Sequence, residues 1–366
     1  MTDSELLSTL ALQSAPNLGD STAKKLIRHF GSAEAIFSTK KESLLKIDGI
    51  GKIKLQGLFD ADRFRLAESE LKFIQRNGIN IHYYQDLDYP EKLKHCNDGP
   101  ILLFSKGNID LNKKRILSIV GTRKITSAGT VFCEKLIEDL AILDPVIISG
   151  FAYGVDITAH KAALKNGLQT IGCLAHGFDQ IYPKTHAKYR AVLEENGGFY
   201  TDFWSSNNFD RNNFLKRNRI IAGLSEATVV IESAAKGGSL VTADIANSYD
   251  REVFAVPGRP TDLQSSGCLN LIKSQNAHVL TSAADLVYIL NWDVQNNSAA
   301  VQKQLFIELE AQEQLVYDFL QDAGRQQLDH IALNCKMPTY KAAGILLEME
   351  LKGAIRPLPG KLFEVI

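Results

Sequence analysis

The chain has few cysteines, no excess of one charge and no long hydrophobic run. Its five cysteines are scattered, odd in number and never spaced as C-x-x-C, so neither a disulfide framework nor a cysteine zinc site is indicated. The formal net charge is −1, so any surface that attracts a polyanion must be local. No apolar stretch could span a bilayer, and the N-terminus lacks a signal pattern. We expect a cytoplasmic protein with reduced thiols and no membrane contact.

What the sequence does contain is typical of a globular protein with several domains. Hydrophobic residues make up 45% and charged residues 23% of the 366 residues, and this length exceeds one compact core. We predict an N-terminal helical module over 1–75, a Rossmann-like domain over 79–290, a linker over 291–305 and a winged-helix-like module over 306–366.

The central domain alternates short β-branched strands with helices. Strands are predicted near 116–120, 146–149, 169–174, 228–232, 252–256 and 277–280, with a weaker one near 199–201 and another over 79–84. This alternation predicts an α/β fold, in which a mostly parallel sheet is covered by helices on both faces. In such a fold the ligand crevice lies beyond the carboxyl ends of the strands.

Loops rich in glycine and small residues follow two of these strands. One is Gly121-Thr122-Arg123-Lys124, and the other begins at Ser149-Gly150 and includes Phe151. Each loop leads into a helix, an arrangement that aims free backbone N–H groups at an anion. The first loop lacks the full G-x-G-x-x-G pattern and no suitable ribose-binding acid follows, so we predict no dinucleotide cofactor.

Three more segments bring cations, rings and small hydroxyls to the same strand ends. They contribute Tyr182, Lys184 and His186; then Arg217, Asn218 and Arg219 from a basic stretch that starts at Arg211; then Lys236, Gly238 and Ser239. Lysine, arginine and closely approaching backbone N–H groups are the usual partners of phosphate. Several strand ends therefore converge on one predicted phosphate site.

The same loops contain no Ser-His-Asp order, no metal-ligand cluster and no carboxylate pair. We therefore predict no catalytic residue and no metal site, and a crevice that holds phosphates without cleaving them. Asp156 is interpreted as the cap of the following helix, and His160 as a histidine buried on that helix's apolar side.

The two terminal modules contain patterns that occur in DNA-binding domains. Residues 47–51, IDGIG, resemble the turn of a helix-hairpin-helix, whose glycines let backbone N–H groups approach a DNA phosphate. The C-terminal module reads as three helices and a hairpin, but its presumed recognition helix carries Glu348 and Glu350. For both modules we favour packing or protein contact over direct DNA binding.

Taken together, the central loops resemble those of the DprA family of bacterial DNA-processing proteins, also called Smf. The matching segments are YPEKL, PILLFSKGN, SIVGTRK, SGFAYGVDITAHKAAL, the turn around IYPK, FLKRNRIIAGLS, GGSLVTADIA, REVFAVPGRP and SSGCLNLI, in order from about 88 to 275. The resemblance implies an extended Rossmann-like domain that binds single-stranded DNA, forms a dimer and delivers the strand to the RecA recombinase during natural transformation. It implies no cofactor.

The resemblance also implies roles for single residues. By motif position, Arg123, Lys184, Arg217 and Arg219 are the expected DNA contacts. The full predicted DNA-binding set is Gly121, Arg123, Lys124, Gly150, Phe151, Tyr182, Lys184, His186, Arg217, Asn218, Arg219, Lys236, Gly238 and Ser239. A single strand is usually held by cations that follow its phosphates and by rings that stack on its bases, and Phe151, Phe178 and Tyr182 are the candidate rings.

Two alternatives remain open at the level of sequence. One is a Rossmann-like enzyme that binds or hydrolyses nucleoside monophosphates, resembling the lysine-decarboxylase-like phosphoribohydrolases. Those enzymes place a glutamate shortly after a P-G-G-x-G-T loop, whereas the comparable loop here supplies only Asp244. The other is a scaffold protein whose central pocket is vestigial, and the cations retained in the loops argue against it.

Overall fold

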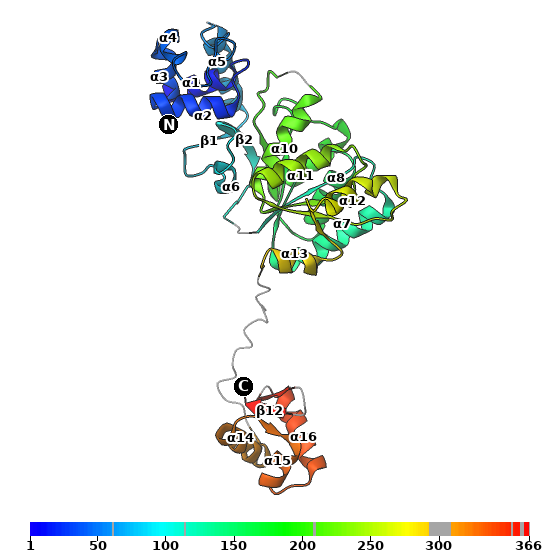
Figure 1. Ribbon diagram of the computed structural model, residues 1–366. Coiled ribbons are helices and arrows are strands. Elements are labelled where there is room, and N and C mark those ends of the chain that lie inside the picture. The colour runs from blue at the N-terminus through cyan, green and yellow to red at the C-terminus, as the bar shows by residue number, and fades with distance from the viewer. Residues whose placement is uncertain are drawn as a thin grey trace. The chain divides into compact units, whose positions relative to one another are not determined.

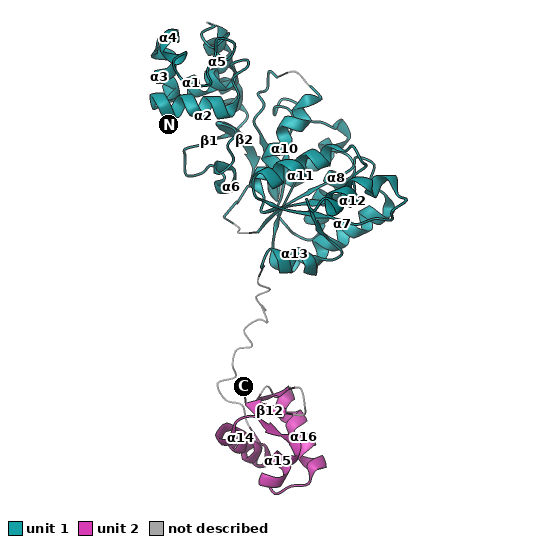
Figure 2. Cartoon of the chain, viewed as in Figure 1, with its two compact units in different colours: residues 1–293 teal, residues 294–366 magenta. Residues whose placement is uncertain are grey.

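The computed structural model describes residues 1–60, 62–112, 115–207, 210–292, 309–352, 354–358 and 362–365. The chain divides into two compact units, residues 1–293 and residues 294–366 (Figure 2). Helices at the N-terminus and the α/β domain belong to the first unit, and the C-terminal helices and hairpin form the second (Figure 1). From residue 293 onward, the predicted linker lies outside the described residues.

The N-terminal module is helical, as predicted. Its helices are α1 (Asp3–Gln13), α2 (Asp20–Phe30), α3 (Ala33–Ser38), α4 (Lys41–Leu44) and α5 (Asp62–Arg76). Leucine and isoleucine side chains from α1 to α4 and from the turns after α4 form one buried cluster. The side chain of Thr2 caps α1 and that of Ser32 caps α3 by accepting backbone N–H groups, which explains where these helices begin.

Among the described residues of the central domain, nine strands form one sheet. They are β1 (Asn80–Tyr83), β2 (Leu102–Gly107), β3 (Ile116–Val120), β4 (Val146–Ser149), β5 (Thr170–Cys173), β6 (Gly197–Thr201), β7 (Ala227–Val230), β8 (Glu252–Ala255) and β9 (His278–Val279). Their order is β1-β2-β6-β5-β4-β3-β7-β8-β9. Strands β3 to β9 pair in parallel, while β2 is antiparallel to β6 and β1 to β2.

This arrangement confirms the predicted α/β fold with a mostly parallel sheet. Strand β2 was not predicted, because a four-residue apolar run between a proline and a glycine cannot be told from a loop by periodicity.

The helices of the central domain are α6 (Glu91–Lys94), α7 (Ser127–Leu140), α8 (Val155–Lys165), α9 (Arg190–Glu195), α10 (Asn212–Leu224), α11 (Gly238–Ser248), α12 (Ser266–Lys273) and α13 (Ala283–Ile289).

Helices cover both faces of the parallel strands (Figure 1). Alternate residues of β3 show how the faces are divided. Ile116 and Val120 point into the cluster formed with α10, α11 and α12, whereas Leu117 and Ile119 point into the cluster formed with α7, α8 and α13. Both sides of β3 are therefore buried, as expected for a parallel strand whose residues other than Ser118 are all apolar.

The chain order of the strands creates a switch point beside β3. From β3 the chain builds β4, β5 and β6 on one side, and then returns to add β7 on the other side of β3. Loops that leave β3 and β7 consequently run in opposite directions over the two faces, which opens a crevice at the carboxyl ends of these strands.

His160 on α8 is buried, as the sequence indicated, and gives a testable effect on acid stability. Its Nδ1 is 2.7 Å from the hydroxyl of Thr170, and its side chain has no solvent exposure. Burial, with smaller effects from the nearby His186 and Arg217, lowers the pKa of His160 to about 3. Because the unfolded chain binds a proton near the ordinary histidine pKa of about 6.5 and the folded chain does not, acidification favours unfolding.

We expect His160→Gln to reduce the loss of stability between pH 7 and pH 5 by about 2 kcal/mol. The glutamine amide can keep the bond to Thr170 but has no proton to gain. Urea denaturation of both proteins at the two pH values measures this difference. An unchanged pH dependence would show that the histidine titrates normally in the folded protein.

The C-terminal unit is a winged helix, as predicted. It contains α14 (Ala311–Ala323), β10 (Gln326–Gln327), α15 (Leu328–Asn334), α16 (Thr339–Leu351), β11 (Ile355–Leu358) and β12 (Leu362–Val365). The strands form one small sheet in the order β10-β12-β11. In neither unit is any described helix both long and apolar enough to cross a bilayer.

Candidate functional site

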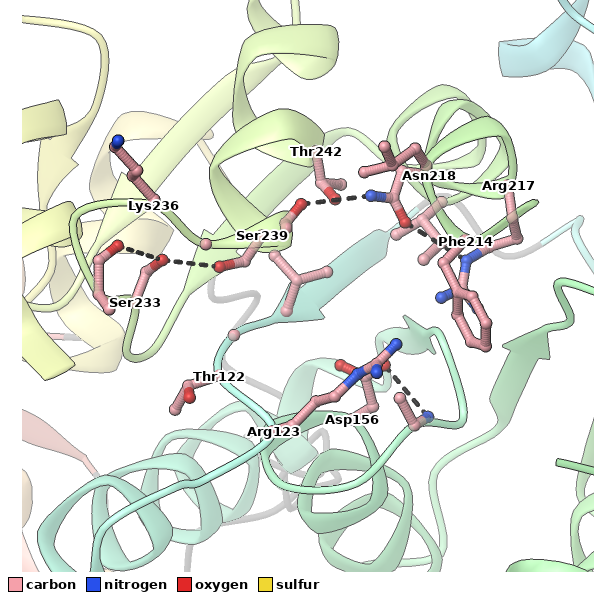
Figure 3. A pocket seen from close by; sticks show the side chains of 18 of the residues that line it. Thr122, Arg123, Asp156, Phe214, Arg217, Asn218, Ser233, Lys236, Ser239 and Thr242 are labelled. Carbon is pink, nitrogen blue, oxygen red and sulfur yellow. Dashed lines mark hydrogen bonds between the residues drawn. The ribbon is translucent and has the colours of Figure 1, made fainter. Parts of the chain in front are cut away.

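A pocket of about 730 Å³ occupies the crevice beside β3, and we call it the switch-point pocket (Figure 3). It is formed by the loops that follow β3, β4, β5 and β7, by helix α10 and by Gln264 from the segment after β8. Its lining comprises Val120, Gly121, Thr122, Arg123, Ala152, Asp156, Tyr182, Arg211, Phe214, Leu215, Arg217, Asn218, Ile221, Ser233, Ala234, Lys236, Gly237, Gly238, Ser239, Thr242 and Gln264. Of these described residues, four are cations and Asp156 is the one carboxylate.

One wall of the switch-point pocket is the N-terminus of helix α11. The helix begins at Gly238, and the residue before it, Gly237, offers no side chain to cap the first N–H groups. Ser239 donates its hydroxyl to the Ser233 hydroxyl at 3.0 Å, and Lys236 is exposed beside them (Figure 3). Uncapped N–H groups and the helix dipole favour an anion at this end.

The opposite wall is built around the ring of Phe214 on α10. The guanidinium carbon of Arg123 lies 4.8 Å from the ring centre, and that of Arg217 lies 5.9 Å from it. The ring of Tyr182 meets the same ring edge-on, with 5.7 Å between centres. Arg123 is exposed and extends from the loop after β3 toward this group (Figure 3). Cations and rings are thus combined on one surface, as ligands with both phosphates and bases require.

Arg217 differs from Arg123 because it is 3% exposed. Its Nη1 donates to the carbonyl of Gly150 at 2.6 Å and also to the carbonyl of Cys173. Burial raises the pKa of the neighbouring Asp156 carboxyl, and the charge of Arg217 partly offsets this effect. Arg217 therefore serves as a structural cation at the floor of the pocket as well as part of its lining.

Asp156 has a different role from the predicted helix cap. The N-cap of α8 is Gly154, which has no side-chain capping bond, while Asp156 accepts the backbone N–H of Ala152 at 3.2 Å. Its carboxylate thus fixes the loop after β4 and faces Arg217 across Gly150. Arg217 and Asp156 hold this loop from both sides.

Gly150 is required because the buried pair leaves no room for a side chain. A Cβ at this position would lie 2.5 Å from Nη2 of Arg217 and 2.6 Å from Oδ2 of Asp156. We expect Gly150→Ala to displace the guanidinium and to lower the free energy of unfolding by about 1–3 kcal/mol. Chemical denaturation measures the loss, with Gly238→Ala as the control, since no heavy atom lies within 4 Å of a Cβ there. Equal stability of the two variants would contradict this packing role.

The structure brings eight of the predicted DNA-binding residues together in the switch-point pocket. They are Gly121, Arg123, Tyr182, Arg217, Asn218, Lys236, Gly238 and Ser239. The other six predicted residues lie outside its lining, for reasons that differ from one residue to the next. They are Lys124, Gly150, Phe151, Lys184, His186 and Arg219.

Phe151 does not present its ring to the pocket, so the expectation that it stacks on a base is corrected. Its backbone has φ of 59°, and the fully buried ring packs edge-on against Phe199 with 5.0 Å between centres. Phe178 also belongs to this core cluster. The exposed ring of the same loop is that of Tyr153, which is 43% exposed and whose oxygen accepts from the Thr185 hydroxyl at 3.1 Å.

His186 lies in the 3-10 helix η2 (Lys184–Tyr189) and is buried. Its Nδ1 donates to the carbonyl of Phe151 at 3.1 Å, so the imidazole supports the loop after β4 instead of facing a phosphate. Lys184 and Lys124 are exposed and lie outside the pocket lining.

Arg219 points away from the switch-point pocket, so its predicted DNA contact would lie outside this pocket. Its guanidinium pairs with Asp20 at 3.0 Å and with Asp202, and it donates to the carbonyl of Asp98. Asp20 begins helix α2, so this pair joins the N-terminal module to the central domain. Two carboxylates therefore already pair with this guanidinium.

Two residues of the lining were not in the predicted set although the sequence held a signal for them. Arg211 lies in the same basic stretch as Arg217 and is exposed. Phe214 precedes Arg217 by three residues, the spacing that places two side chains on one side of a helix. That spacing could have identified the ring before the structure did.

Comparisons with known proteins agree with this architecture. A sequence profile described as DNA recombination-mediator protein A matches residues 80–291. Profiles of the DprA winged helix domain and of a SAM-like helix-hairpin-helix tandem match residues 302–361 and 9–61. The helix-hairpin-helix likeness predicted from the IDGIG turn is confirmed at the level of this fold.

Named relatives cover most of the chain. Protein Smf of Escherichia coli K12 is 34% identical over 302 residues, which are 80% of this chain and 79% of that protein. The DNA processing protein DprA of Streptococcus pneumoniae R6 is 38% identical over 199 residues, 54% of this chain and 70% of that protein.

Two solved structures resemble the chain as well. The X-ray structure of DprA from Streptococcus pneumoniae matches with a TM-score of 0.67 and 29% identity, covering 78% of this chain and 98% of that one. A structure of DNA processing protein A from Helicobacter pylori, described as showing a single-stranded DNA binding mode, matches with a TM-score of 0.53 and 26% identity. It covers 58% of this chain and 95% of that one.

Proposed function

The chain belongs to the DNA recombination-mediator protein A family, and on that basis we propose that its switch-point pocket binds single-stranded DNA without sequence preference. The observation that carries this proposal is the wall formed by Arg123, Phe214 and Tyr182 opposite the uncapped N-terminus of α11. Phosphates fit the cations and the helix end, and bases fit the rings.

The balance of charge in the pocket supports a polyanion as the ligand. Its four cations, Arg123, Arg211, Arg217 and Lys236, stand against one carboxylate among the described lining residues. The whole chain carries a formal charge of −1, so this excess is local, as binding to DNA in a near-neutral protein requires.

We propose that the pocket holds the strand and does not cleave DNA or nucleotides. Its carboxylate, Asp156, is buried and bonded to the loop after β4, where it is not free to act as a general base. Glu232, just after β7, accepts hydrogen bonds from the N–H and the hydroxyl of Thr126, so its carboxylate is also not free to act as a general base. Asp244, the residue that a hydrolase would need to use, does not line the pocket.

The family also suggests two partners, a second copy of this chain and the RecA recombinase. We propose that the protein acts as a homodimer that delivers the bound strand to RecA in natural transformation and recombination. Light scattering of the purified protein tests the dimer. Filament formation by RecA on DNA coated with single-strand-binding protein, with and without this chain, tests delivery.

The binding proposal predicts a steep dependence on salt. Fluorescence anisotropy of labelled single-stranded and double-stranded oligonucleotides across a salt series measures the affinity and the slope. For a single strand, each phosphate contact contributes about 0.7 to the slope of log affinity against log salt. We expect Arg123→Ala to weaken single-strand binding by about tenfold or more and to reduce that slope by about 0.7.

Arg76→Ala is the matched control, because Arg76 is exposed at the end of α5 and is absent from the pocket lining. It should bind as the wild-type protein does. If Arg123→Ala binds unchanged, the switch-point pocket does not hold the strand. Nucleoside monophosphates are then the next ligands to titrate.

A further inference from the structure

A second pocket, of about 330 Å³, lies on the antiparallel strands β1, β2 and β6 at one edge of the sheet. We call it the edge pocket. His82, Asp88, Ser105 and Tyr200 are among its lining residues, and none of the described residues that line it also lines the switch-point pocket. It is therefore separate from the proposed DNA-binding pocket.

Three of these side chains form a continuous hydrogen-bonded relay. The hydroxyl of Ser105 is 2.8 Å from Nε2 of His82, and Nδ1 of the same ring is 2.7 Å from a carboxylate oxygen of Asp88. A carboxylate only accepts, so it selects the tautomer with the proton on Nδ1. The lone pair of Nε2 is then directed at the Ser105 hydroxyl, as a general base directed at a serine nucleophile would be.

The strand register explains why these groups meet and adds hydrogen-bond donors beside them. Ser105 on β2 pairs directly with Asn80 on β1 and with Tyr200 on β6, so the three side chains stand in one row on one face of the sheet. His82 lies two residues along β1 from Asn80, on the same face. The ring of His82 meets that of Tyr200 edge-on, with 5.9 Å between centres.

Tyr200 and Asn80 flank Ser105 in the strand register and bring hydrogen-bond donors to the same pocket. Burial raises the pKa of the Tyr200 phenol, so its hydroxyl keeps its proton at neutral pH. The Asn80 side chain also lines the pocket and carries an amide N–H₂ group. Donors beside a serine nucleophile stabilise the oxyanion of a tetrahedral intermediate.

We propose that the edge pocket is an acyl-transfer site in which Ser105 is the nucleophile, His82 the general base and Asp88 a positioning residue. Ser105 Oγ attacks the carbonyl carbon of an ester, and its proton passes to Nε2 of His82. The bond to the leaving alcohol breaks, and that alcohol takes the proton. Water then attacks the acyl-serine with the same base, which releases a carboxylic acid and restores the Ser105 hydroxyl.

The charge of the edge pocket indicates the class of substrate. Asp88, Glu91 and Asp110 line it, and no lysine or arginine appears among its described lining residues. Phosphodiesters and other anions are therefore repelled, whereas small neutral or cationic esters are accepted. Leu87, Ile109 and Leu111 provide an apolar surface for the acyl group.

Labelling with a fluorophosphonate tests this proposal, because the reagent phosphonylates an activated serine and loses fluoride. Mass spectrometry of peptides from the full-length wild-type protein should find the adduct on Ser105. Ser105→Ala should lose it, and His82→Ala should slow labelling at least 100-fold. Ser248→Ala, an exposed serine on α11, is the control and should label at the wild-type rate.

Two further measurements separate catalysis from a structural role. Hydrolysis of p-nitrophenyl acetate should fall at least 100-fold in Ser105→Ala, whose folding is checked by thermal denaturation. Asp88→Asn should lower the maximal labelling rate without changing the reagent concentration at half-saturation, and Asp88→Glu should restore part of that rate. The absence of an adduct on Ser105, or an adduct that forms equally fast without His82, would overturn the proposal.

Discussion

Replacement of Arg217 with alanine is expected to abolish single-strand binding and to lower the free energy of unfolding by about 3–5 kcal/mol. Arg217 is 3% exposed, and its guanidinium donates to the carbonyls of Gly150 and Cys173. Without it, the two carbonyls lose their buried partner and the buried carboxylate of Asp156 loses its neighbouring positive charge. The loop after β4 then loses the contacts that hold it against the pocket floor.

Comparison with Arg123→Ala separates the loss of DNA binding from the loss of stability. Arg123 is exposed on the loop after β3, so its loss should weaken binding while stability stays within about 0.5 kcal/mol of the wild-type value. Urea denaturation and anisotropy on the same preparations measure both quantities. Full stability of Arg217→Ala would contradict the structural role of this cation.

A lysine at position 217 provides a further distinction. It keeps the positive charge near Asp156, but a single ammonium group cannot reproduce the fork of donors that reaches two carbonyls. We expect Arg217→Lys to have an intermediate stability and weak DNA binding. If lysine restored binding completely, charge alone would account for the contribution of Arg217 to the pocket.

The second large effect is expected from Arg219→Ala, which should cost about 3–5 kcal/mol of stability and leave single-strand affinity unchanged in the folded protein. Arg219 compensates Asp202 and Asp20 in a largely buried site between the N-terminal module and the central domain. Its removal leaves two neighbouring carboxylates without their cation. Hydrogen exchange should then rise in α2, which Asp20 begins.

The pH dependence of this variant has a defined sign. Burial raises the pKa of Asp202, and Arg219 opposes that rise in the wild-type protein. Without Arg219 the folded state binds this proton more tightly than the unfolded state does, so acidification favours folding of the variant. The stability difference from the wild type should therefore shrink between pH 7 and pH 5. If Arg219→Ala instead lost DNA affinity without losing stability, Arg219 would be a DNA contact.

The parallel strands were predictable because each is a short β-branched or apolar run bounded by small or polar residues. Ile116–Val120 and Val146–Ser149 coincide with their predicted ranges, since strands buried on both faces are rich in apolar residues. The fold class followed from this repetition. Strand β2 did not, because a run of four apolar residues has no period to distinguish it.

The directions of side chains were less predictable than the elements that carry them. Arg217 and Arg219 lie in one basic stretch, but two residues of a helix differ by about 200° in direction, so one faces the pocket and the other faces Asp202. The ring of Phe151 lies in the core, and its backbone has a positive φ, which is uncommon for a residue other than glycine and was not predicted from the sequence.

The edge pocket shows a different limit of sequence analysis. Ser105 and His82 lie on separate strands, and the sequence gives no spacing that connects them. They meet because the register of β1 on β2 sets Asn80 opposite Ser105 and leaves His82 two residues away on the same face. Since β2 itself was not predicted, neither its register nor this relay could be derived without the structure.

The pairing of β3 with β7 has a consequence for protein synthesis. Val120 and Val230 are partners, yet roughly a hundred residues separate the two strands along the chain. A ribosome adds about 5–20 residues per second, so β7 is synthesised roughly 5 to 20 s after β3. During that interval one side of β3 is an open edge available to other strands. A nascent chain therefore gains its candidate DNA pocket only once α11 has emerged.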